Sequence, residues 1–203
     1  MTDLHLILVD PSEQLCDAFH TAFVTLPNAE IVNGYFQRVA VFDCMVSPAN
    51  SFGLMDGGVD AAIIDYFGAD LMQRVQRYIL DEYLGEQPVG TSFVIETHHP
   101  DHPWLAHTPT MRIPMQIIGT DYVYLAMWAM LRAVHYHNRD HDQKIKTVVC
   151  PGLGTGVGHM PFSEAARQMA LAYKNYLNPP THIDWTYASR RQILIQHGGH
   201  LGL

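Results

Sequence analysis

The sequence is poor in charge, and above all in positive charge. Asp, Glu, Lys and Arg make up 16% of its 203 residues, and 20 acids against 12 Lys and Arg give a net charge of −8. No dense run of Lys or Arg is present. Because nonspecific nucleic-acid binding depends on clustered cations, this composition argues against that function. A phosphate-bearing ligand would have to be held mainly by backbone N–H groups and helix ends.

Cysteines and long apolar runs are also scarce. The three cysteines, Cys16, Cys44 and Cys150, show no paired spacing, which favours buried free thiols and a reducing cytoplasm. No apolar run reaches the length of a membrane span. The first apolar run, residues 4–9, is short and lacks the cleavage site of a secretory signal. We therefore expect a cytoplasmic protein without a membrane segment.

What the sequence does contain is an alternation of short apolar runs and helical patterns. An apolar content of 48% over 203 residues is typical of one globular domain, predicted here over residues 1–203. The alternation predicts an α/β fold with a mostly parallel, buried sheet. Strands are predicted at 4–9, 29–36, 39–47, 91–97, 104–111 and 145–151, and helices at 11–26, 60–84 (with a break near Gly68), 120–137 and 161–177.

Two glycine-rich segments each follow a predicted strand and precede a helix: SPANSFGLMDGGVD (47–60) and PGLGTGVGHM (151–160). Glycine lets a backbone approach a ligand closely, and a helix N-terminus adds a partial positive charge. In open α/β sheets, ligands bind outside the carboxyl ends of the strands. We therefore predict one diphosphate-bearing ligand held by both loops. The alternative is that both are tight turns with no ligand.

Neither loop fits the common nucleotide-binding motifs. A G-x-x-x-x-G-K-[ST] sequence is absent, which argues against a kinase or ATPase phosphate loop. A G-x-G-x-x-G sequence that opens a first βαβ unit, with an acid about twenty residues on, is absent too. The loops therefore indicate a different kind of anion site.

Several segments resemble those of the macrodomain family, an ADP-ribose-binding module. DCMVSPAN (43–50) resembles that family's DAIVNAAN, SFGLMDGGVDAAI (51–63) resembles SSLLGGGGVDGAI, and LAHTP (105–109) resembles VIHTVGP. PGLGTGVGHMPFSEAA (151–166) resembles PAISTGVYGYPxxxAA. The resemblance covers about residues 1–190. It implies a three-layer α/β/α fold with a central mixed, mostly parallel sheet and an ADP-ribose cleft across the strand ends.

The resemblance also implies roles for individual residues. Asn50 would hydrogen-bond hydroxyls of the distal ribose, and Asp60 matches the carboxylate that hydrolase members use to position or activate water near the anomeric carbon. One side of the distal ribose and diphosphate would be lined by Gly57, Gly58 and Val59, and the other side by Gly154, Thr155, Gly156, Val157 and Gly158. We expect no cofactor.

These residue types suit the implied chemistry. A carboxylate can orient a water and take its proton, and a nearby diphosphate should make it a better base. An amide offers a donor and an acceptor together, which suits a vicinal diol. Each residue also has a purely structural alternative. Asp60 could be the N-cap of the following helix, and Asn50 could be a turn residue at a strand end.

The sequence departs from the family pattern at two places. Tyr35 stands near the position of an Asp that accepts a hydrogen bond from the adenine amino group in macrodomains. Tyr35 or Phe36 could stack on a base, or either could belong to the core or its rim. Gly158, His159 and Met160 stand where the family has YGY. His159 could therefore contact the substrate, or it could be a solvated loop residue.

Thirteen histidines raise the question of a metal site. The segments HHPDHP and HYHNRDHD lack the spacing of recognised zinc sites, and we expect no metal. The predicted helix at 120–137 is apolar almost all round. That pattern favours burial, with a homo-oligomer interface as the alternative.

Three functions remain open at this point. The first is hydrolysis of a mono-ADP-ribosyl bond on a protein or nucleotide derivative, or of an ADP-ribose 1''-phosphate, with Asn50 and Asp60 as the catalytic pair. The second is a noncatalytic reader or sensor of an NAD-derived metabolite. The third is an inactive structural protein on the same scaffold, with the cleft closed by side chains such as Met55 or Met160.

Overall fold

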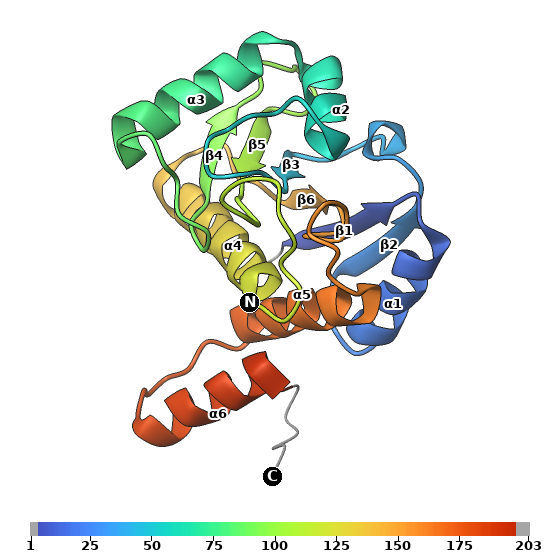
Figure 1. The fold of residues 1–203 in the computed structure, drawn as a ribbon, viewed down its shortest axis with the longest axis vertical. Coiled ribbons are helices and arrows are strands. Elements are labelled where there is room, and N and C mark those ends of the chain that lie inside the picture. Colours follow the sequence, from blue (N-terminus) through green and yellow to red (C-terminus); the bar gives the residue numbers. More distant parts are fainter. Residues whose placement is uncertain (1–3, 198–203) are drawn as a thin grey trace.

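A six-stranded sheet forms the centre of the computed structural model, which describes residues 4–197 (Figure 1). The strands lie in the order β2-β1-β6-β3-β5-β4, and all neighbours are parallel except the antiparallel pair β4 and β5. The predicted mixed, mostly parallel sheet is therefore confirmed. The strands are β1 His5–Asp10, β2 Ala29–Asn33, β3 Cys44–Ser47, β4 Phe93–Glu96, β5 Trp104–His107 and β6 Thr147–Cys150.

Helices cover both faces of this sheet and give the predicted three layers (Figure 1). One face packs against α1, α4 and α5, and the other packs against α2 and α3. Strand side chains alternate between the two layers, so Val46 joins the first apolar cluster and Met45 the second. The helices are α1 Glu13–Phe23, α2 Gly58–Phe67, α3 Asp70–Tyr83, α4 Tyr122–Asp140, α5 Phe162–Leu177 and α6 Trp185–His197, with a 3-10 turn, η1, at Phe36–Arg38.

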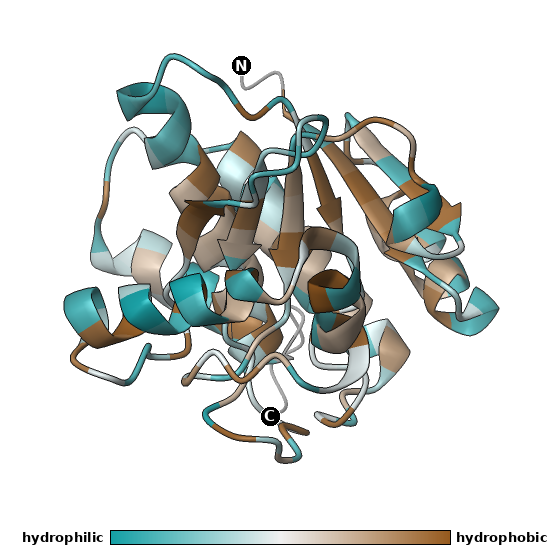
Figure 2. Ribbon diagram, turned by 90° about the horizontal axis from the view of Figure 1, so that it is seen from above, coloured by the Kyte–Doolittle hydropathy of each residue, from teal (hydrophilic) through white to brown (hydrophobic). Residues whose placement is uncertain are grey.

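Local sequence explains where the first helix begins and which face it buries. Ser12 is the N-cap of α1, and its side chain accepts a hydrogen bond from the N–H of Leu15. Leu15, Phe19 and Phe23 recur every four residues and are buried against the sheet. In Figure 2 the strands are mainly brown, which marks the apolar layer between the helices.

Several predicted boundaries were wrong. β2 ends at Asn33 and β3 begins at Cys44, because the intervening chain turns through η1, where the N–H of Val39 bonds the carbonyl of Phe36. β5 ends at His107, and the residues after it pair with the loop that follows β3. The helix predicted from residue 60 begins earlier, at Gly58.

Helix α6 has no counterpart among the sequence-based predictions. It is attached by the Arg191 guanidinium, which lies 4.5 Å from the centre of the Trp128 ring. Arg167 of α5 adds hydrogen bonds to the carbonyls of Leu194 and Ile195. The predicted single domain over residues 1–203 extends beyond the described residues and stays a prediction.

Two composition-based expectations can be compared with the structure. Cys16, Cys44 and Cys150 are buried and free, as predicted. Within residues 4–197, no helix combines the length and the apolar character that crossing a bilayer requires.

Candidate functional site

Both glycine-rich segments leave the same edge of the sheet. β3 and β6 are adjacent and parallel, with Met45 opposite Val149. Residues 48–57 (the first loop) and residues 151–161 (the second loop) therefore start at neighbouring carboxyl ends. Residues 108–121 (the connecting segment) contact both loops. Met111 forms a bridge with Asn50, and the N–H of Ile117 bonds the carbonyl of Gly158 at 2.9 Å.

Asn50 organises the first loop. Its Nδ2 donates to the carbonyl of Leu54 at 2.7 Å, and its Oδ1 accepts from the N–H groups of Phe52 and Leu54 at 3.0 and 3.3 Å. The predicted turn role of Asn50 is therefore confirmed. An amide nitrogen carries two hydrogens, so one donor is left over for a ligand.

The glycines at the end of the first loop face open space. Gly57 is the N-cap of α2, and Gly58 has a φ of 57°, which favours glycine. A Cβ built on either residue would meet no atom within 4 Å. The backbone at the start of α2 is thus accessible to a ligand, and the helix end favours an anion there.

Asp60 lies in the first turn of α2 and is almost completely buried, with 7% of its surface exposed. Its Oδ1 accepts a hydrogen bond from Ser47 Oγ at 2.7 Å. Burial raises the pKa of Asp60 to about 6, and the hydrogen bond from Ser47 acts in the opposite direction. The N-cap alternative for Asp60 is wrong, because Gly57 holds that position and the carboxylate bonds a strand residue instead.

A buried polar pair, His107 and Gln87, is hydrogen-bonded to the first loop. His107, at the end of β5, stands in register with Ser47, and its Nδ1 lies 2.6 Å from Gln87 Oε1. The N–H of Gln87 also donates to the carbonyl of Ser51 at 2.9 Å. Complete burial lowers the pKa of His107 to about 3, so the imidazole is neutral. Its Nε2 has no partner within the described part of the chain.

Packing, and not open space, explains most glycines of the second loop. A Cβ on Gly152 would lie 2.4 Å from Leu15, one on Gly154 would lie 2.7 Å from Ile117, and one on Gly158 would lie 2.4 Å from the carbonyl oxygen of Gly154. Gly156 differs, since a Cβ there would meet nothing within 4 Å.

The other predicted residues of the second loop lie toward its surface. Val157 is 58% exposed, and Thr155 donates to the carbonyl of Gly152 at 3.3 Å. His159 is exposed with a φ of 50°, and its N–H bonds the carbonyl of Gly156 at 2.9 Å. His159 therefore closes a turn within the loop.

Tyr35 and Phe36 separate in the structure. Phe36 is buried and packs edge-on against Tyr66 and face-on against Phe67, so its predicted stacking on a base is corrected to a core role. Tyr35 is 56% exposed, and the Arg38 guanidinium lies 5.9 Å from its ring centre. Of this pair, Tyr35 is the residue whose side chain is exposed.

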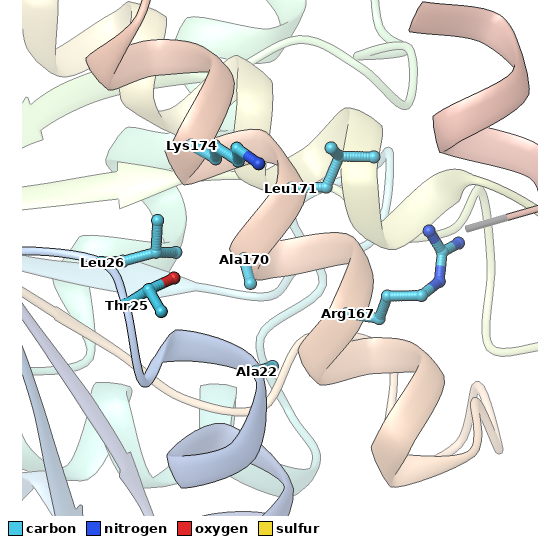
Figure 3. Close-up of a pocket in the computed structure, with 7 residues that line it drawn as sticks. All are labelled: Ala22, Thr25, Leu26, Arg167, Ala170, Leu171 and Lys174. Atoms are coloured by element: carbon cyan, nitrogen blue, oxygen red, sulfur yellow. The ribbon is translucent and has the colours of Figure 1, made fainter. Parts of the chain in front are cut away.

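Two cavities lie away from these loops. One of about 220 Å³ lies between α1 and α5, where it is lined by residues that include Leu26, Arg167 and Lys174 (Figure 3). Another of about 210 Å³ is lined by residues that include Tyr83 and Arg132. Neither contains a predicted site residue.

Met55 and Met160, the side chains expected to close an inactive cleft, are both buried. They belong to different apolar clusters, on opposite faces of the sheet. Both methionines therefore fill the core, each on its own side of the sheet.

Histidine-rich segments contribute packing. His99 and His102 stack on each other, His102 stacks on Phe42 and His99 stacks on Tyr66. No group of three or more His, Cys, Asp or Glu side chains in the described ranges is arranged to hold a metal ion.

Comparison with known proteins identifies the scaffold. The family model described as "Macro domain" matches residues 46–169. An uncharacterized protein of Aquifex aeolicus is 32% identical over 147 residues, which cover 72% of this chain and 81% of that protein. The macrodomain of Mycobacterium tuberculosis DarG superposes with a TM-score of 0.58 at 19% identity, covering 70% of this chain and 87% of that one.

Structures of an Oceanobacillus iheyensis macrodomain are similar as well. A glycine-to-valine variant with ADP-ribose has a TM-score of 0.57 at 18% identity, covering 84% of this chain and 77% of that one. Variants with alanine in place of an aspartate or an asparagine have TM-scores of 0.54. In that protein the glycine follows the asparagine by seven residues and precedes the aspartate by three. Asn50, Gly57 and Asp60 have the same spacing. The chain belongs to the macro domain family.

Proposed function

We propose that this chain binds ADP-ribose or a derivative of it between the first and second loops and hydrolyses a mono-ADP-ribosyl bond. The observation that carries the proposal is the origin of both loops at the carboxyl ends of adjacent parallel strands, with Asp60 beside them. Family membership and the ADP-ribose in a related structure support the same ligand.

Backbone groups supply most of the proposed binding. The diphosphate would sit at the N-terminus of α2, against Gly57, Gly58 and Val59, where the helix end favours an anion. The segment from Gly154 to Gly158 would close the other side, with Gly156 facing the ligand. The chain thus holds an anion without a Lys or Arg cluster, in agreement with its net charge of −8.

Side chains would hold the two ends of the ligand. The remaining N–H of Asn50 would donate to a hydroxyl of the distal ribose. Tyr35, exposed just beyond β2, is the candidate for contact with the base.

Asp60 would act as the general base. Water attacks the anomeric carbon of the distal ribose, Asp60 takes a proton from that water, and the bond from the anomeric carbon to the acceptor breaks. The acceptor leaves with the bonding electron pair and receives a proton from Asp60 or solvent, so the products are ADP-ribose and free acceptor. A pKa of about 6 keeps the carboxylate ionised at neutral pH yet basic enough to take the proton.

Replacing the base tests the proposal. Asp60→Ala should lower turnover of an ADP-ribosylated peptide by on the order of a hundredfold or more. ADP-ribose should still raise its melting temperature, because the backbone contacts remain. Asp56→Ala is the matched control, since Asp56 is an exposed acid in the first loop, four residues before Asp60. Unchanged turnover in Asp60→Ala would restrict Asp60 to a structural role.

A noncatalytic reader of an NAD-derived metabolite is the second candidate. It is favoured by two observations: the side chain of Asn50 is bonded within its own loop, and Asp60 is only 7% exposed. A reader would be stabilised by ADP-ribose and would release no product from an ADP-ribosylated peptide over hours.

A further inference from the structure

Ser47 has no assigned role, yet its hydroxyl contacts the proposed base. Resting on the hydrolysis proposed above, we propose that Ser47 is a positioning residue that fixes one carboxylate oxygen of Asp60 and leaves the other to face the attacking water. Ser47 itself touches no substrate in this arrangement.

The two oxygens of Asp60 have different surroundings. Oδ1 accepts the 2.7 Å hydrogen bond from Ser47. Oδ2 accepts no hydrogen bond within residues 4–197, and it is not among the buried atoms that lack a partner, so it keeps contact with solvent. A buried carboxylate with one tethered and one accessible oxygen has a defined direction from which it can take a proton.

Ser47 can hold this position because the sheet fixes its backbone. It is the last residue of β3, is fully buried, and its carbonyl accepts the N–H of Thr108 at 3.0 Å. Asp60 lies thirteen residues later, in the first turn of α2. The hydrogen bond therefore ties the end of β3 to the helix that carries the base, and it spans the first loop.

Among residues 4–197, no charged side chain shifts the pKa of Asp60 alongside Ser47. Within the described part of the chain, desolvation and the Ser47 hydrogen bond are the influences that shift its pKa. His107 on β5 is neutral and bonded to Gln87. Asp56 and Asp65, before and within α2, are exposed. The buried side chains that α3 adds to the same cluster are apolar: Leu71, Val75 and Ile79.

Loss of the Ser47 hydroxyl should therefore lower turnover by favouring the protonated form of Asp60. A hydrogen bond to the charged form of a carboxylate lowers its pKa, so Ser47→Ala should keep Asp60 protonated to higher pH. Turnover should fall most where wild-type Asp60 is ionised and the variant is not. At high pH both are ionised, and the difference should shrink to the effect of misorientation alone.

The test compares three variants from about pH 5 to about pH 9. Ser47→Ala removes the hydroxyl and Ser47→Thr retains one. Cys44→Ala removes a single buried atom from the same strand, on the face away from Asp60. We would measure kcat/KM on an ADP-ribosylated peptide, and the titration of the Asp60 carboxyl carbon by NMR without substrate.

For Ser47→Ala we expect the midpoint of the kcat/KM pH profile and the midpoint of the Asp60 NMR titration both to rise by on the order of one pH unit. Its kcat/KM should be about threefold below wild type near pH 6.5, between the two midpoints, and should approach wild type near pH 9. Ser47→Thr should keep the wild-type midpoint, as should Cys44→Ala.

The failures can be told apart. Wild-type protein that binds ADP-ribose without any turnover would refute the hydrolysis, and the catalytic role of Ser47 with it. Turnover in the wild type, with an unchanged midpoint in Ser47→Ala, would refute the role of Ser47 alone. An equal loss at every pH in Ser47→Ala and Cys44→Ala would likewise reduce Ser47 to a packing residue.

Discussion

The first and second loops look alike in sequence but are held in different ways. Side-chain hydrogen bonds from Asn50 shape the first loop, and Gly57 at its end and Gly58 at the start of α2 face open space. The second loop is shaped by glycines that leave no room for a Cβ, as at Gly154 and Gly158. Glycine content alone therefore does not separate residues needed by the fold from residues available to a ligand.

The two loops also differ in the groups that they offer to a ligand. The proposed base and the amide that organises the turn both belong to the first loop and the helix after it. The second loop offers mainly backbone, closed against the connecting segment through Ile117. We expect substitutions at Asp60 to change turnover and its pH dependence, those at Asn50 to change affinity, and those at the packed glycines of the second loop to change stability.

The largest expected effect is a gain in stability from Asp60→Asn. Because the folded chain binds the Asp60 proton more tightly than the unfolded chain, its charge lowers stability above about pH 6, and this cost disappears as the pH falls from about 6 to about 4. A pKa raised from 3.8 to about 6 lowers the free energy of unfolding by about 3 kcal/mol at pH 8.

Urea unfolding at pH 8 and below pH 4 checks this prediction. Asp60→Asn should be more stable than wild type at pH 8 and equal to it at the lower pH, whereas Asp56→Asn, at an exposed acid, should match wild type at both. An equal stability of Asp60→Asn and wild type at pH 8 would mean that no charge is buried at the first loop.

Next in size is Gly158→Ala in the second loop. The added Cβ would lie 2.4 Å from a backbone oxygen, which cannot move aside as a flexible side chain can. We expect a loss of about 2 kcal/mol of unfolding free energy, measured by urea denaturation. If Gly158→Ala is as stable as wild type, the backbone of the second loop can move to make room for a Cβ, and its packing is looser than we infer.

Asn50→Ala should have a smaller effect, confined to the first loop. It removes three hydrogen bonds to loop backbone, two of them accepted by Oδ1. We expect a loss of about 1 kcal/mol in stability, with a clear loss of ADP-ribose affinity in calorimetry because the turn relaxes. Asn50→Asp keeps acceptor oxygens for the N–H groups of Phe52 and Leu54 but loses the amide donor, so it separates support of the turn from contact with the ligand. Equal affinity in all three proteins would leave Asn50 without a part in the site.

The smallest change in stability is expected for Gly156→Ala. A Cβ there meets no atom within 4 Å, so unfolding free energy should change by less than about 0.5 kcal/mol. If Gly156 faces the diphosphate, the same methyl group should weaken ADP-ribose binding. Undiminished binding would place the ligand away from Gly156.

Much of this architecture could be predicted from the sequence, because hydrophobic alternation and the order of strands and helices are local signals. The two loops and the parallel sheet were identified in this way, whereas the role of Asp60 came from the resemblance to macrodomains and stays a prediction. The burial of Asp60 and its bond to Ser47 were missed, because they arise when α2 packs on β3. The start of α2 was placed two residues too late, which is why an N-cap role for Asp60 stood as an alternative.

Other errors also have a tertiary origin. Phe36 was a candidate for stacking on a base because it stands beside Tyr35, near the adenine-binding position of the resembled family. In the structure η1 turns its ring into the core, as the structural alternative had it. Helix α6 went unrecognised because its attachment depends on Arg191 meeting Trp128, a contact between segments far apart in the chain. Gln87 carried no signal in the sequence, since its partners His107 and Ser51 come from other parts of the fold.

Isothermal titration of the wild-type chain with ADP-ribose tests most directly whether the paired loops form a ligand site. We predict saturable heat with a stoichiometry of about one ligand per chain, weakened in Gly156→Ala while that variant keeps wild-type stability. A folded chain that gives no heat of binding at millimolar ADP-ribose would contradict the account.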